Sequence, residues 1–196
     1  MPRTANSPRA KRPPRVTTLS WGLQGDLLDL NVWLALAVKE HPHHAAAYRY
    51  WEALQTPLQA STGAVPFKLY FCRQTAMGLV HLLCQAGVVG EGALTLDAAW
   101  KLYQRIRALP STGLLVEPLG CEAALGAILA SQDGAGASLW PSANLAALAQ
   151  SSGLRLVSFD YDLQRLGLTN FLLLRDDAEL EAEAKAQIWA VNKGGM

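Results

Sequence analysis

The stretch that decides the fold is Leu27-Leu28-Asp29-Leu30-Asn31-Val32-Trp33-Leu34-Ala35-Leu36, and it has a counterpart much further along the chain in Leu156-Val157-Ser158-Phe159-Asp160. Each stretch contains a short apolar run that leads to a carboxylate. A strand inside a parallel sheet is apolar on both faces because both faces are covered. The polar chemistry of an open α/β sheet gathers at the carboxyl ends of its strands. We therefore expect Asp29 and Asp160 to meet over one crevice.

Two carboxylates at such a crevice are typical of a divalent-metal site, because Mg²⁺ and Mn²⁺ prefer hard oxygen ligands. Asn31 lies beside the first aspartate and Asp162 beside the second, so both are candidates for additional contacts. The alternative is that each aspartate caps the helix or turn after its strand. For Asp162 this alternative is the N-cap of the turn at 163–166. For the pair of Asp29 and Asp160 we favour the metal site.

Strand-like and helix-like segments alternate along the rest of the chain, which indicates a parallel sheet of four or five strands covered by helices on both faces. Besides the strand before Asp29, we expect strands at 67–72, 113–117, 154–158 and 171–174. A first helix is expected from about 32, and a second with Pro42 in its first turn. Further helices are expected at 74–84, after Thr95 as N-cap, at 121–130 and from 142. We expect a loop at 87–92. The cluster of His41, His43 and His44 is expected at a helix start and not as a set of metal ligands, because neighbouring residues do not share a helix face.

Composition places these elements in a single domain with two tails. Residues 1–18 are rich in proline and arginine and are expected to be a disordered basic tail, and 176–196 are expected to form a C-terminal helical extension of the 26–175 domain. The apolar runs are too short to span a bilayer, so we expect no membrane association. Three cysteines without a paired spacing indicate free thiols and a cytoplasmic location.

The segment from 27 to 171 resembles a PIN domain, and more closely the VapC-type ribonuclease toxins of bacterial toxin–antitoxin pairs. The resemblance rests on the stretches at 27–36, 41–51, 145–149 and 157–160. It implies a three-layer α/β sandwich and an endoribonuclease that depends on Mg²⁺ or Mn²⁺, with Asp29 and Asp160 as catalytic metal ligands and Asp162 as a further ligand. It also implies RNA as substrate, a homodimer and a small antitoxin as partner.

The chain departs from the family pattern at two of its usual four acidic positions. No Asp or Glu occurs between 53 and 90, where the family carries an acid on the helix after its second strand, and Met77 or Ala76 stands there instead. Ser142 occupies the position of the acid that opens the helix near 145. The expected pocket therefore combines the two aspartates with Asn31, Ser142, Ser158 and Met77.

Two functions from different classes follow from this pattern. The first is a metal-dependent endoribonuclease with impaired activity, because two anionic ligands are missing. The second is a nuclease-dead PIN module that binds RNA or a protein partner, because fewer negative charges then confront an incoming phosphate. A neighbouring reading frame for a small DNA-binding protein would favour the toxin.

Overall fold

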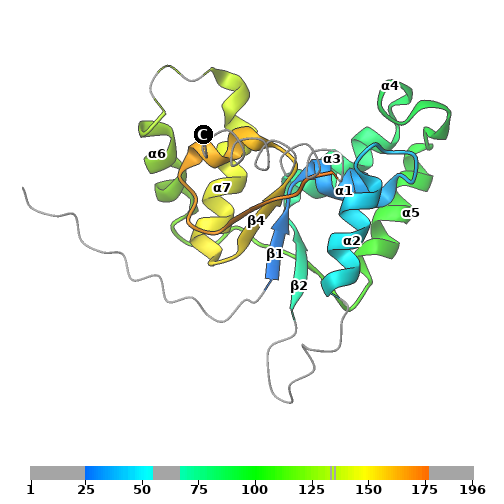
Figure 1. The fold of residues 1–196 in the computed structure, drawn as a ribbon, viewed down its shortest axis with the longest axis horizontal. Coiled ribbons are helices and arrows are strands. Elements are labelled where there is room, and N and C mark those ends of the chain that lie inside the picture. The colour runs from blue at the N-terminus through cyan, green and yellow to red at the C-terminus, as the bar shows by residue number, and fades with distance from the viewer. Residues whose placement is uncertain (1–24, 55–66, 133, 135, 177–196) are drawn as a thin grey trace, which may run out of the picture.

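The computed structural model describes residues 25–54, 67–132, 134 and 136–176. Its centre is a five-stranded parallel sheet in the order β3-β2-β1-β4-β5, which confirms the predicted fold class (Figure 1). The strands are β1 (Gly25–Leu28), β2 (Lys68–Phe71), β3 (Thr112–Leu114), β4 (Arg155–Ser158) and β5 (Phe171–Leu173). The first strand therefore lies in the middle of the sheet, beside the strand that leads to Asp160.

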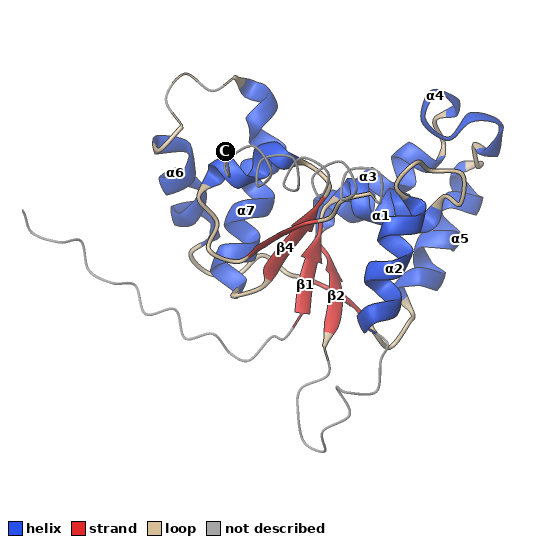
Figure 2. Cartoon of the chain, in the orientation of Figure 1, coloured by secondary structure: helices blue, strands red, loops and turns tan. Residues whose placement is uncertain are grey.

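Helices cover both faces of the sheet, as Figure 2 shows. One face carries α1 (Leu30–Ala37), α2 (His44–Leu54), α3 (Arg73–Leu83) and α5 (Leu96–Arg107), and the other carries α6 (Cys121–Ala130) and α7 (Trp140–Ser152). Successive residues of β1 pack into opposite helical layers: Leu27 packs with α7, and Leu28 packs with α1 and α3. Both side chains are fully buried, so the apolar run has the two-sided burial that its sequence predicts.

Several boundaries differ from the sequence prediction for local reasons. Helix α1 begins at Leu30 and not near Val32, because the Asp29 side chain accepts a hydrogen bond from the Leu30 N–H and caps the helix. Helix α7 begins at Trp140, ahead of the predicted start at Ser142, because Pro141 occupies its first turn. Pro42 lies in the turn before α2 and not inside the helix.

The remaining short elements include one correction. The loop predicted at 87–92 is wrong, because the structure has a one-turn helix α4 (Ala86–Val89) followed by a 3₁₀ turn η2 (Gly90–Gly92). Its glycines made a loop the simpler prediction, but the Val88 and Val89 N–H groups both bond to the Gln85 carbonyl and close a helical turn. Two further 3₁₀ turns are η3 (Ala137–Leu139) and η4 (Tyr161–Leu166). The predicted N-cap at Thr95 is confirmed, because its side chain accepts from the Ala98 N–H.

A buried ion pair at the amino-terminal edge of the sheet joins β1 to β4. Asp26, 1% exposed, accepts hydrogen bonds from Arg155 at 2.9 and 2.6 Å and one from the Tyr50 hydroxyl. Asp26 and Arg155 are also direct partners in the strand register, and Leu28 is opposite Val157 two residues later. This register brings Asp29, the residue after β1, and Ser158, the last residue of β4, to the same height at the carboxyl edge.

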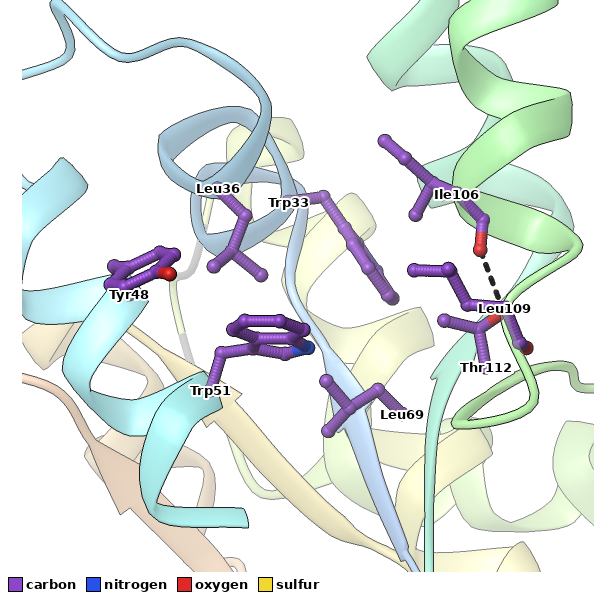
Figure 3. A pocket seen from close by; sticks show the side chains of 8 residues that line it. All are labelled: Trp33, Leu36, Tyr48, Trp51, Leu69, Ile106, Leu109 and Thr112. Carbon is purple, nitrogen blue, oxygen red and sulfur yellow. Dashed lines mark hydrogen bonds between the residues drawn. The ribbon is translucent and has the colours of Figure 1, made fainter. Parts of the chain in front are cut away.

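An apolar hollow of about 170 Å³ lies between α1, α2 and α5 (Figure 3). The residues that line this hollow are Trp33, Leu36, Tyr48, Trp51, Leu69, Ile106, Leu109 and Thr112. Within that described lining there is no carboxylate, histidine or cation, so this hollow cannot supply metal ligands. The predicted site residues Asp29 and Ser158 lie instead at the carboxyl edge of the sheet.

The predicted tails fall largely outside the described residues, because 1–24 and 177–196 are not among them. The proposed basic tail at 1–18 and nearly all of the C-terminal extension therefore stay predictions. No helix in the described part of the chain is long and apolar enough to cross a membrane. Cys72, Cys84 and Cys121 are all free thiols, as predicted.

Candidate active site

Asp29 is the first residue after β1, and its two carboxylate oxygens accept hydrogen bonds from different groups. Oδ1 accepts a hydrogen bond of 2.6 Å from the Leu30 N–H, which is the cap that starts α1. Oδ2 instead accepts from the Asn31 side chain at 3.0 Å and from the Ser158 hydroxyl at 2.6 Å. The cap and the site were alternatives in the sequence analysis. The structure shows that one aspartate caps its helix and also faces the polar groups of the next strand.

Ser158 is the centre of the polar cluster. Its hydroxyl is fully buried, donates to Asp29, and accepts hydrogen bonds from Asn31 Nδ2 and from the Asp160 N–H, both at 2.9 Å. Asn31 Oδ1 in turn accepts from the Phe159 N–H at 3.3 Å. Because β1 and β4 are neighbours, these bonds connect residues 127 to 129 positions apart in the chain. The predicted proximity of Asn31 and Ser158 to Asp29 thus has a definite geometry.

Asp160 starts the turn that follows β4. Its Oδ1 accepts a 2.9 Å hydrogen bond from the Asp162 N–H, which makes Asp160 the cap of η4. The expectation that Asp162 caps this turn is therefore wrong by two residues. Asp162 lies inside the first turn, its side chain is 70% exposed, and it pairs with Arg165 at 3.4 Å. An exposed partner of an arginine is poorly placed to act as a buried metal ligand.

The surroundings of Asp29 disfavour the ionised form of its carboxyl group. Burial raises its pKa above the ordinary value, and the negative charge of Asp160 raises it further. Hydrogen bonds from Ser158, Leu30 and Asn31 act in the opposite direction without cancelling the effect. Two close carboxylates repel each other, and a bound cation relieves that repulsion.

The side-chain ligand atoms in this cluster limit which metal ions it can bind. The described residues contain no group of three or more His, Cys, Asp or Glu side chains placed to bind a metal ion. Asp29 and Asp160 alone nevertheless fit Mg²⁺, which keeps several waters and often uses only one or two carboxylates together with substrate phosphates. The residues therefore suit a weak cation site that is completed by other ligands.

The two positions without acids are occupied by neutral groups. Met77, expected in the crevice, is 62% exposed and lines a separate hollow on α3 and α5 with Arg73 and Trp100. Ala76 is buried. The residue of α3 that faces the start of α1 is Gly78, since a Cβ there would lie 2.6 Å from Leu30 Cδ2.

On α7, Ser142 is half-buried in the first turn. An amide pair joins this turn to α3. Asn144 Nδ2 donates to Gln74 Oε1 at 2.9 Å, and Gln74 Nε2 donates to the Pro141 carbonyl at 3.3 Å. No local sequence pattern pairs residues 70 positions apart, so this contact could not be predicted from the sequence.

The histidine cluster lies at the start of α2, as predicted. His44 Nδ1 contacts the Ala35 carbonyl at 2.7 Å, and the His41 ring accepts from the His43 N–H. His43 pairs with Asp176 at 2.7 Å and stacks on Phe159 with ring centroids 4.5 Å apart. Sequence reasoning missed this contact, which ties the turn before α2 to the residue between Ser158 and Asp160.

Comparison with known proteins identifies the family of this chain. The PIN domain family model matches residues 27–168. Ribonuclease VapC41 of Mycobacterium tuberculosis, found in two strains, is 32% identical over 154 residues, which cover 76% of this chain and 97% of that protein.

Solved structures share the fold. VapBC2 from Rickettsia felis, bound to a DNA fragment from its promoter, matches with a TM-score of 0.55 and 9% identity over 78% of this chain and 100% of that one. The sarcin–ricin loop cleaving toxin VapC20 of Mycobacterium tuberculosis matches with a TM-score of 0.50 and 17% identity over 74% of this chain and 97% of that one. Together with the polar cluster at the carboxyl edge, the family match and the 32% identity show that the chain belongs to the PIN-domain family, as a VapC-type member.

Proposed function

We propose that this protein is a VapC-type ribonuclease that binds Mg²⁺ or Mn²⁺ between Asp29 and Asp160 together with an RNA phosphate, and that it cleaves RNA feebly. The observation that carries the proposal is the hydrogen-bonded cluster of Asp29, Asn31, Ser158 and Asp160 at the ends of two adjacent strands. A half-buried carboxylate with a raised pKa beside a second carboxylate is typical of a functional site.

The residues of the cluster have separate roles in this proposal. Asp29 and Asp160 would hold the cation, which would supply Lewis-acid polarisation of the phosphate and a more acidic water. Ser158 and Asn31 fix the orientation of the Asp29 carboxylate. Asp29 cannot turn away, because its other oxygen caps α1. Orientation by such supporting bonds commonly affects metal affinity by about 10- to 100-fold.

Weak cleavage follows from the neutral groups on α3 and α7. Two fewer carboxylates lower the attraction for the cation and remove a candidate base. The same absence favours phosphate binding, because α3 and α7 have no acid in their first turns. The positive end of a helix dipole attracts anions. The second candidate function, a nuclease-dead module that binds RNA, rests on this balance of charges.

The decisive experiment measures cleavage of a mixed-sequence RNA by the full chain in MgCl₂, in MnCl₂ and in EDTA. We expect slow cleavage with either metal, none in EDTA, and none by Asp29→Asn or Asp160→Asn. Asp97→Asn is the matched control, because this exposed aspartate of α5 pairs with its helix neighbour Lys101 and lies outside the polar cluster. Metal-independent cleavage, or cleavage that survives Asp29→Asn, would refute the proposal. RNA binding without any cleavage would select the second function.

The family also suggests partners. We infer a small antitoxin of the kind found with VapBC2, a cytoplasmic location in keeping with the free thiols, and a homodimer. The homodimer is supported by three exposed apolar residues around the hollow on α3 and α5, namely Met77, Leu96 and Trp100, which are 62%, 69% and 47% exposed. Light scattering should give a dimer mass for the wild type and a monomer mass for Leu96→Glu. Coexpression with the product of an adjacent small reading frame tests the antitoxin.

A further inference from the structure

The amide pair between α3 and α7 has a defined orientation. A backbone carbonyl can only accept, so the Gln74 nitrogen must face the Pro141 carbonyl. The Gln74 oxygen then faces Asn144, and the Asn144 nitrogen must donate to it. Each amide is thus oriented by the next group in the chain of hydrogen bonds. The two helices hold a fixed pattern of donors and acceptors.

The fixed pattern leaves specific groups available. Asn144 retains its Oδ1 acceptor and one N–H donor, which form no hydrogen bond with the described residues. Both residues are only half-buried. An amide that offers one acceptor beside one donor matches the N6 amino group and N7 of adenine. Splayed bases of single-stranded RNA are commonly read on their edges in this way.

The location of the pair fits a role in substrate recognition. Helix α3 follows β2, and α7 runs back before β4, so the first turns of both helices lie at the carboxyl edge of the sheet (Figure 1). That edge carries Asp29 and Asp160. In addition, Trp140 is 57% exposed and lies four residues before Asn144, on the same helix face. An exposed indole is a stacking surface for a base.

We infer that Asn144, oriented by Gln74, reads an adenine of the bound RNA, with Trp140 as its stacking surface. The inference rests on the proposed function, because it names the base that the same site recognises. Asn144 contacts the base, whereas Gln74 is a positioning residue that acts through Asn144. The preference for adenine therefore depends on both amides, and the affinity for RNA in general depends on Trp140.

The test compares RNA hexamers of uridine with one central base varied. Fluorescence anisotropy of the full chain, in EDTA and again in MgCl₂ at times too short for cleavage, gives the Kd for adenine, 7-deazaadenine, cytosine and guanine at that position. The 7-deaza base lacks only the N7 acceptor. We expect the adenine hexamer to bind at least about 5-fold more tightly than the 7-deaza hexamer, the lower end for a bidentate amide contact.

Variants separate the two amides from a structural effect. Asn144→Ala should abolish the preference for adenine, Gln74→Ala should reduce it, and Trp140→Ala should weaken all hexamers alike. Gln132→Ala is the matched control, because this amide also bonds a backbone carbonyl, that of Arg165, but lies outside the first turns of α3 and α7. Thermal unfolding of each variant checks the fold.

The outcomes distinguish this inference from the proposed function. Equal Kd values for adenine and 7-deazaadenine in the wild type, or an unchanged ratio in folded Asn144→Ala, would overturn the inference and leave the nuclease proposal intact. Failure of the wild type to bind any hexamer in either buffer would overturn both. A preference that disappears in Asn144→Ala and survives in Gln132→Ala supports the reading of the base by the amide pair.

Discussion

Replacing Ser158 with alanine should destabilise the protein and disturb the candidate site at the same time. The buried hydroxyl donates to the Asp29 carboxylate at 2.6 Å and accepts from Asn31 Nδ2 and from the Asp160 N–H. Alanine removes all three bonds. Asn31 keeps a second acceptor in Asp29 Oδ2, but the Asp160 N–H has no other partner among the described residues.

The magnitude follows from the kind of bond that is lost. A hydrogen bond to a charged group contributes about 1.5–3 kcal/mol, a neutral one about 1 kcal/mol, and the three are not additive. We therefore expect the free energy of unfolding to fall by about 3 kcal/mol. For a chain of this size that loss lowers the Tm by roughly 6–12 °C.

The change also acts on the pKa of Asp29. Burial raises this pKa, and the Ser158 hydroxyl is the strongest opposing influence, so the alanine variant raises the pKa further. A carboxyl group with a raised pKa costs stability only when it is ionised. The difference between variant and wild type should therefore shrink as the pH falls toward the ordinary carboxyl pKa of 3.8.

Urea unfolding at several pH values measures the stability, and carboxyl NMR titration measures the pKa. The control is Ser151→Ala, whose hydroxyl donates only to carbonyls of its own helix, those of Ala147 and Leu148, and should cost less than about 1 kcal/mol. A loss below about 0.5 kcal/mol for Ser158→Ala with an unmoved Asp29 pKa would refute the role assigned to this serine.

Three further predictions concern charged groups. Asp29→Asn should remove the pH dependence that the raised pKa of Asp29 gives the wild type, whose stability falls as the pH rises from the ordinary carboxyl pKa toward the raised one. Urea unfolding at several pH values checks it, and an unchanged pH slope in the variant contradicts it. MgCl₂ should raise the Tm of the wild type more than that of Asp29→Asn in differential scanning fluorimetry, and equal shifts would place the cation elsewhere. Arg155→Met should lower the free energy of unfolding by about 3 kcal/mol, because it leaves the charge of Asp26, which is only 1% exposed, without its partner. This is the low end for an unpaired buried charge, since the Arg155 side chain is itself 34% exposed. The control Arg165→Met breaks the exposed pair with Asp162 and should cost below about 1 kcal/mol, and similar losses in the two variants would refute the role of the buried pair.

Local patterns in the sequence were sufficient for the fold class. The apolar runs before Asp29 and Asp160 predict buried strands because two-sided burial demands continuous hydrophobicity, and the structure has both strands, side by side. The helix at 121–130 has the predicted bounds, and Thr95 caps the helix that follows it. These features depend on neighbours within a few residues. Short-range periodicity and capping chemistry therefore predict them.

Local patterns also selected Asp29, Asp160, Asn31 and Ser158 as neighbours, because the carboxyl ends of parallel strands share one edge. They could not decide which aspartate caps the last turn, since Asp160 and Asp162 are both suitable caps and only the backbone geometry after β4 chooses Asp160. Local patterns also could not place Met77, because the orientation of α3 in the fold decides that Gly78 packs on Leu30 while Met77 faces α5.

The contacts that the sequence could not predict join residues far apart in the chain. The tertiary fold brings together Gln74 with Asn144, and His43 with Phe159 and Asp176. The sequence by itself thus determined the strands, the helices and the edge of the sheet where the chemistry gathers. The tertiary structure alone decided the partners of each polar group, because a hydrogen bond depends on distance and direction in space, and packing of whole helices sets both.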